Sequence, residues 1–151
     1  MKKYIFFIFL CLLIILFLYR RAGTAIKDST VTINSAVFKV EIANTPEEKT
    51  KGLGYRVSLP HNQGMVFVFD NPGHYSFWMR HMRFPLDIIF ILNDKVVGVY
   101  ENLPPAAPTE TSPPTSGGEL LSDHVLEINA GLARKYNIQV GDSVVYNIKN
   151  L

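Results

Sequence analysis

The residues most able to do chemistry are concentrated at positions 77–87, where the chain reads Phe-Trp-Met-Arg-His-Met-Arg-Phe-Pro-Leu-Asp. This stretch contains the only tryptophan of the chain, Trp78, followed by Arg80 and, at its end, Asp87. Alternation along an extended strand would place Trp78 and Arg80 on the same face. An aromatic ring beside charged groups suits a sugar or a polar peptide, because the ring stacks on an apolar surface while the charged groups form hydrogen bonds.

Two acidic residues, Asp87 and Glu127, stand among apolar neighbours. A carboxyl group in such surroundings is either partnered or has a raised pKa. For Asp87 we expect an ion pair with an arginine, hydrogen bonds from backbone N–H groups, or contact with a ligand. For Glu127 the simplest expectation is a salt bridge to Arg56, Arg80 or Arg83.

The same two acids also permit an enzymatic hypothesis. If Asp87 and Glu127 shared one cleft at ~5–9.5 Å, they could serve as acid and base in a hydrolase of envelope polymers. The sequence contains no nucleophile elbow or phosphate-binding loop, and its four histidines lack a metal-ligand spacing. Its single cysteine, Cys11, lies in an N-terminal apolar segment. The sequence therefore predicts no metal and no cofactor.

Short apolar or alternating segments separated by turn-forming pairs predict the strands that must position these residues. The strands are expected at 30–33, 37–43, 65–69, 75–79, 86–92, 95–100, 124–128 and 143–149. Thr45-Pro46-Glu47-Glu48 is typical of a helix start with a capping box, and the glycines that follow would end this helix. A second short helix is expected at 130–136. We predict a mainly β fold, a small β-sandwich or barrel of about seven strands with one or two short helices.

A proline-rich segment separates two of the predicted strands. Residues 102–118 contain five of the nine prolines, among Thr, Ser, Ala and Gly, and are predicted to form an irregular loop. Long loops inside compact domains are commonly functional or disordered. We therefore expect this loop to lie over the binding site.

The N-terminus carries a long apolar segment. Residues 4–19 are uncharged and are bracketed by basic pairs, so residues 1–21 are predicted to form a single-pass membrane anchor. The segment is short for a ~30 Å hydrocarbon core, but the flanking basic side chains can snorkel and extend its reach. Residues 22–28 would be a tether and residues 29–151 a domain on the extracytoplasmic side. The alternative is a signal peptide cleaved near 23–25, which would make the domain secreted.

The anchor segment also explains the basic character of the whole chain. Residues 1–21 contain four basic residues and no acidic one, whereas residues 22–151 contain 11 basic and 13 acidic residues. A nucleic-acid-binding domain normally has a basic surface, so we expect no nucleic-acid partner.

Several segments, in order, resemble the DUF192 family (also called UPF0127) of small prokaryotic domains. They are Thr45-Pro46-Glu47-Glu48 with Gly52-Leu53-Gly54-Tyr55-Arg56, Gly64-Met65-Val66-Phe67-Val68-Phe69, Phe77-Trp78-Met79-Arg80, Pro85-Leu86-Asp87-Ile88-Ile89-Phe90, Val125-Leu126-Glu127 with Gly131, and Gly141-Asp142. The resemblance implies a compact, mainly β fold, often behind a signal or anchor segment, and no established activity. The chain departs from the family at Gly54, where Met is usual, and at His81-Met82, where Asn-Thr is usual.

These observations favour a membrane-tethered, non-catalytic binding or accessory module of the cell envelope. Its candidate ligand-binding residues are Arg56, Trp78, Arg80, Asp87 and Glu127, and the ligand would be a carbohydrate or a peptide. The hydrolase using Asp87 and Glu127 is one alternative. A structural subunit of a membrane complex, which would use an exposed strand edge or apolar patch, is the other.

Overall fold

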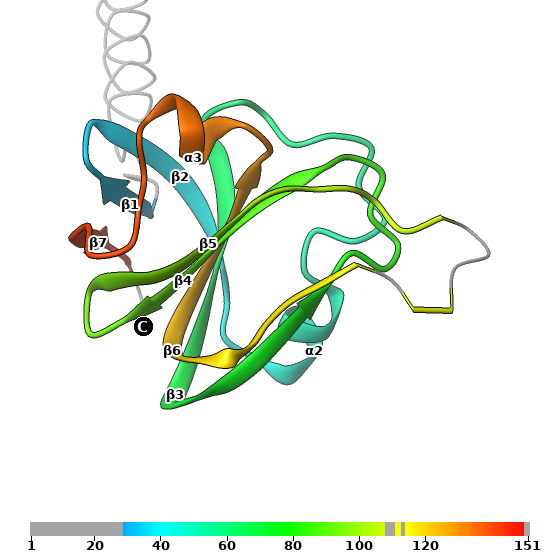
Figure 1. The fold of residues 1–151 in the computed structure, drawn as a ribbon, viewed down its shortest axis with the longest axis horizontal. Helices are drawn as coiled ribbons and strands as arrows, with labels where there is room; N and C mark the ends of the chain where they lie inside the picture. The colour runs from blue at the N-terminus through cyan, green and yellow to red at the C-terminus, as the bar shows by residue number, and fades with distance from the viewer. Residues whose placement is uncertain (1–28, 108–110, 113, 150–151) are drawn as a thin grey trace, which may run out of the picture.

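The computed structural model describes residues 29–107, 111–112 and 114–149, and these form a seven-stranded, mainly β domain with two short helices (Figure 1). In chain order the elements are β1 Thr30–Ile33, β2 Ala36–Ala43, α2 Pro46–Lys51, β3 Gln63–Trp78, β4 Leu86–Leu92, β5 Lys95–Leu103, β6 Thr115–Asn129, α3 Leu132–Lys135 and β7 Val144–Asn147. No helix among the described residues is long and apolar enough to cross a membrane. The anchor predicted at 4–19 and the tether at 22–28 lie outside the described residues.

All seven strands belong to one curled sheet with the order β5-β4-β6-β3-β2-β1-β7. Curling brings the two edge strands together at one end, where the Val96 N–H donates to the Asp142 carbonyl at 3.0 Å and the Gly141 N–H donates to the Val96 carbonyl at 2.9 Å. The strands therefore form a single sheet rather than the two packed sheets of a sandwich.

The central strands are buried on both faces, so the sheet separates two hydrophobic cores. In β4, Ile89 and Ile91 point into one core with Leu132 and Ala133 of α3. The alternate residues of β4, among them Ile88, point into the other core. Figure 1 shows α2 and α3 on different sides of the central strands. Successive side chains of one strand consequently meet different surroundings.

The local signals for helices and turns are confirmed. Thr45 caps α2, its side chain accepting from the Glu48 N–H at 3.2 Å while the Glu48 carboxylate accepts from the Thr45 N–H at 3.1 Å. The β4–β5 hairpin turns at Asn93 and Asp94, both with positive φ, as two-residue hairpins require. α3 lies within the range expected for the second helix.

The prediction of two strands at 65–69 and 75–79, separated by a turn, is wrong. Both segments belong to β3, which stays paired with β6 but shifts register between Val68 and Gly73. The residues of β3 between Val68 and Gly73 have no paired residues in β6 and form an irregularity within the strand. There the rings of Phe69 and Tyr75 stack with centroids 3.5 Å apart, and the Tyr75 hydroxyl donates to the Asn71 carbonyl at 2.7 Å.

The proline-rich loop is also shorter than predicted, because strand structure enters residues 102–118 from both sides. β5 runs to Leu103 and β6 begins at Thr115. Gly117 explains part of this extension: its φ of 77° is a left-handed conformation, and an added Cβ would lie 2.4 Å from the ring of Phe90. Only glycine fits there, so this residue supports close strand packing rather than a flexible loop.

Candidate functional site

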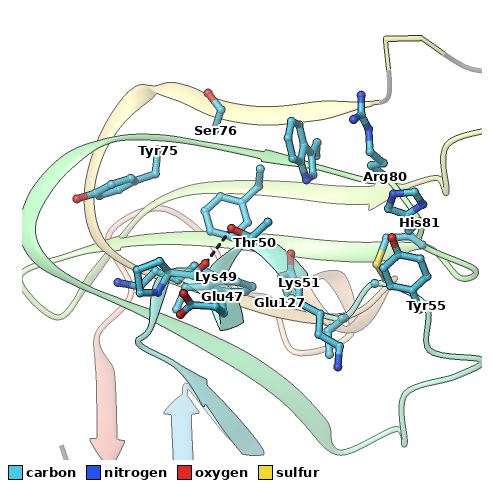
Figure 2. Close-up of a pocket in the computed structure, with 18 of the residues that line it drawn as sticks. Glu47, Lys49, Thr50, Lys51, Tyr55, Tyr75, Ser76, Arg80, His81 and Glu127 are labelled. Atoms are coloured by element: carbon cyan, nitrogen blue, oxygen red, sulfur yellow. Dashed lines mark hydrogen bonds between the residues drawn. The ribbon is translucent and has the colours of Figure 1, made fainter.

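A cleft of about 820 Å³ opens between α2, with the segment that follows it, and the C-terminal half of β3 (Figure 2). Five aromatic side chains of β3 line it: Phe67, Phe69, Tyr75, Phe77 and Trp78. The opposite wall carries polar side chains, including Glu47, Lys49 and Lys51 of α2. Cavities of this volume with apolar linings and a few polar groups are typical small-molecule sites.

Glu127 lies in the floor of this cleft. In β6 it is opposite Met65 of β3 and Ile88 of β4, and it is only 5% exposed. Its Oε2 atom has no hydrogen-bond partner in the described part of the chain. Burial raises the pKa of Glu127 to about 8, and the positive charge of Arg56 opposes that shift. At neutral pH the side chain is therefore mainly protonated and can donate a hydrogen bond into the cleft.

Gly52, the residue that ends α2, covers Glu127. Its φ of +49° is left-handed, and a Cβ built there would lie 3.3 Å from the ring of Phe67 and 3.8 Å from Oε2 of Glu127. A side chain at this position would press on the Phe67 ring and contact the carboxyl group. The end of α2 therefore packs closely against the floor of the cleft.

The predicted salt bridge between Glu127 and Arg56, Arg80 or Arg83 is wrong for the described residues. Arg56 forms a bidentate ion pair with Glu41 instead, through Nη1–Oε1 and through Nη2–Oε2 at 2.8 Å. The register explains this choice, because Glu41, Met65 and Glu127 lie in one row across β2, β3 and β6. The hydrogen bond from Arg56 holds the pKa of Glu41 below its ordinary value. Arg56 therefore acts on Glu127 only through its charge.

Asp87 does not reach the cleft. It is fully buried, and its two carboxylate oxygens accept from the backbone N–H groups of Asn102 and Ala133, each at 2.8 Å. In the β4–β6 ladder Asp87 is opposite Ile128, whereas Glu127 is opposite Ile88. Because adjacent residues of a strand point to opposite faces, Asp87 and Glu127 lie on opposite sides of the sheet. The structure does not bring together the pair that the hydrolase hypothesis requires.

Trp78 and Arg80 both line the cleft. Trp78 is 53% exposed, and the guanidinium carbon of Arg80 is 4.9 Å from the centroid of its ring. This distance is that of a cation–π contact. Of the five candidate residues, Trp78, Arg80 and Glu127 line one cleft, while Arg56 and Asp87 do not.

Tyr55 and His81 were not identified from the sequence as site residues, although both line the cleft. Their rings stack with centroids 4.5 Å apart, and the Tyr55 N–H donates to the His81 carbonyl at 2.9 Å. Gly54 lies beside this pair: a Cβ there would lie 3.7 Å from that of His81, an ordinary contact, but only 2.9 Å from the Lys51 carbonyl oxygen, which is why the position needs glycine. Gly54 and His81, the two places where the chain departs from the family pattern, are therefore neighbours. These paired departures were the sequence signal that could have identified Tyr55 and His81 as site residues.

Backbone strain is concentrated at the same stacked pair. Seven described residues other than glycine have positive φ, and five of them are Asn or Asp, which tolerate this conformation. The other two are Tyr55, at 67°, and His81, at 61°. Left-handed conformations cost roughly 1–2 kcal/mol for such residues and often occur at functional sites.

No group of three or more His, Cys, Asp or Glu side chains that could hold a metal ion occurs among the residues that the structure describes. The functional groups of the cleft are instead aromatic rings, cationic side chains at its mouth and the buried carboxyl of Glu127. Such a set can stack on a ligand, bind its charged or hydroxyl groups and donate a hydrogen bond from below.

The fold and the cleft define a small, mainly β domain with a ligand-sized cavity beside its first described helix. Residues 29–146 match the model of the family DUF192, described as "Uncharacterized ACR", and the chain belongs to this family. A search of curated proteins finds no match.

Two solved structures are similar to this chain. One is a protein of unknown function from Novosphingobium aromaticivorans, with 36% identity, a TM-score of 0.69, and coverage of 77% of this chain and 83% of that one. The other is from Sinorhizobium meliloti and is described as "a putative transcription regulator". It has 27% identity, a TM-score of 0.68, and coverage of 78% of this chain and 92% of that one.

Proposed function

We propose that this protein is a membrane-tethered binding module whose cleft takes a carbohydrate of the cell envelope. The observation that carries the proposal is the position of Glu127, a buried carboxyl group with an unpartnered oxygen, in the floor of an aromatic cleft. A buried polar group without a partner costs free energy, and such exceptions call for an explanation. A ligand hydroxyl that reaches the carboxyl would supply the missing hydrogen bond.

The mouth of the cleft supports a carbohydrate over a purely apolar ligand. A sugar ring has one face of C–H groups, which can pack on the half-exposed ring of Trp78, and a rim of hydroxyl groups. Arg80 and Lys51 lie where they can bind those hydroxyl groups. Aromatic rings bury a large area at a small loss of side-chain entropy, so they suit an exposed recognition surface.

The proposed location depends on the N-terminal segment. Residues 4–19 form an uncharged run between basic pairs, and such a segment near the N-terminus favours a signal-anchor with the domain outside the cytoplasm. Fusion of alkaline phosphatase after residue 151 tests this part. An active, membrane-bound fusion supports this location. A fusion that stays equally active after residues 1–21 are deleted contradicts it.

Trp78 offers a direct binding test because it is the only tryptophan of the chain. Full-length protein in detergent should show a saturable change in fluorescence when titrated with soluble envelope oligosaccharides. Trp78→Phe serves as the background control, and Glu127→Ala should weaken binding by roughly tenfold, the effect of one lost buried hydrogen bond. If no saccharide changes the fluorescence, and Glu127→Ala alters no binding measured by calorimetry, the proposal is wrong.

A further inference from the structure

A second cleft of about 400 Å³ adjoins the first. The two clefts share four lining residues, Tyr55, Arg80, His81 and Met82, so the second begins where the first ends. It continues past Arg83 to Ala106, just beyond β5. The two clefts, together called the groove, meet at the stacked rings of Tyr55 and His81.

This groove is rich in positive charge. Lys49 and Lys51 line its first part, Arg80 lines both parts, and Arg83 lines the second. None of these four forms an ion pair with an acid within residues 29–107, 111–112 and 114–149, whereas Arg56 and Arg134 are paired with Glu41 and Glu101. Among the described residues that line the groove, the acidic ones are Glu47 and Glu127, and burial raises the pKa of Glu127 to about 8, which keeps it mainly neutral.

The aromatic surfaces follow the same line. Trp78 exposes 53% of its surface beside the first cleft, and Tyr55 exposes 59% where the clefts meet. The left-handed backbone at Tyr55 and His81, together with the hydrogen bond between them, holds this second ring surface in place without a ligand. Such preorganisation reduces the entropy that binding must otherwise overcome.

We propose that the two clefts form one extended groove for an acidic polysaccharide, with successive sugar units on Trp78 and on the Tyr55–His81 pair and their carboxylates on the cationic side chains. This inference rests on the proposed function and deepens it by naming the substrate class and a second subsite. Single-stranded nucleic acid also uses cations and stacking rings, but residues 22–151 contain 11 basic and 13 acidic residues, a net charge near −2, and so lack the basic surface typical of domains that bind a phosphate backbone.

The experiment compares oligogalacturonates of one and six units with their neutral methyl esters, using Trp78 fluorescence of the full chain in detergent. The hexamer should bind at least about tenfold more tightly than both the monomer and the methyl-esterified hexamer, since charge-assisted contacts are typically worth more than one decade in affinity. Equal binding of the acid and the ester, or of hexamer and monomer, overturns the inference but leaves the proposed function standing. Absence of binding by any saccharide overturns both.

Two variants locate the second subsite. Arg83→Ala should weaken hexamer binding roughly tenfold and monomer binding far less, and the matched control Arg134→Ala, which removes the same charge outside both clefts, should change neither. His81→Asn removes the stacking ring with a residue that tolerates positive φ, so it keeps the fold and should also weaken the hexamer selectively. Equal effects of Arg83→Ala and Arg134→Ala overturn the second subsite.

Two further polymers test the chemical class. Poly-L-glutamate carries carboxylates without sugar rings, and a single-stranded oligonucleotide carries phosphates with stacking bases. If either binds as tightly as the hexagalacturonate, recognition is not of an acidic polysaccharide. Weaker binding by both, at the same ionic strength, supports the assignment.

Discussion

Asp87 and Glu127 are both buried acids of the central sheet, but they lie on opposite faces and differ in their hydrogen-bond partners. Asp87 has both oxygens bonded to backbone N–H groups, which tie β4 to the end of β5 and to α3. Glu127 has an unpartnered oxygen, no ion pair among the described residues and a raised pKa, and it lines a cleft. The comparison teaches that burial alone does not indicate function. The hydrogen-bond partners of a buried acid separate a structural role from a binding role.

The largest expected effect is on the structural side of this comparison. Asp87→Asn replaces one acceptor oxygen by an amide that faces an N–H donor, so it should lower the free energy of unfolding by about 3 kcal/mol. Chemical denaturation of the full chain in detergent measures this change. The same acid-to-amide change in Glu127→Gln breaks no hydrogen bond of the described residues. A loss as large for Glu127→Gln would mean that both acids are structural.

The pH dependence of stability should come from Glu127. Its pKa of about 8 in the folded state lies above the ordinary value of 4.5, so between these values the folded protein keeps a proton that the unfolded chain releases. This contribution to stability is full below about pH 4.5 and is lost as the pH rises through about 8. From about pH 6 to about pH 8 the wild type should lose about 2 kcal/mol relative to Glu127→Gln. Parallel stability curves for the two proteins would contradict the raised pKa.

A smaller effect is expected where α2 ends over Glu127. Gly52→Ala places a Cβ in a left-handed conformation and against the ring of Phe67, which should cost roughly 1–2 kcal/mol. Gly131→Ala is the comparison variant: Gly131 also has positive φ, but it is in the left-handed α region, which Gly52 is not, and no atom lies within 4 Å of its added Cβ. Thermal unfolding of both variants measures the difference. Gly52→Ala should be the less stable, and only it should weaken ligand binding.

The smallest effect on stability is expected at Arg56. Its ion pair with Glu41 is partly exposed, so Arg56→Ala should change stability by no more than about 1 kcal/mol. It should nevertheless raise the pKa of Glu127 further, because the opposing positive charge is lost. Carboxyl carbon NMR titration measures that pKa. Arg134→Ala, which breaks the Arg134–Glu101 pair, is the control and should leave the pKa of Glu127 unchanged.

Much of the fold could be predicted from local patterns. β1 and β4 begin and end at the predicted residues, and the capping box at Thr45 and the Asn93–Asp94 turn form as expected. These features depend on neighbours within a few residues, so the sequence contains them. Predictions failed at β3 and at 102–118, where pairing with a distant strand overrides local turn signals.

The sequence by itself determined where β1, β4 and α2 begin and that Asp87 and Glu127 would be unusual acids among apolar neighbours. Only the tertiary structure decided that Asp87 is held by backbone N–H groups, that Arg56 pairs with Glu41, and that Tyr55 stacks on His81. The physical reason is that a partner far along the chain is set by strand register and sheet curvature, which assemble contacts that no local spacing encodes.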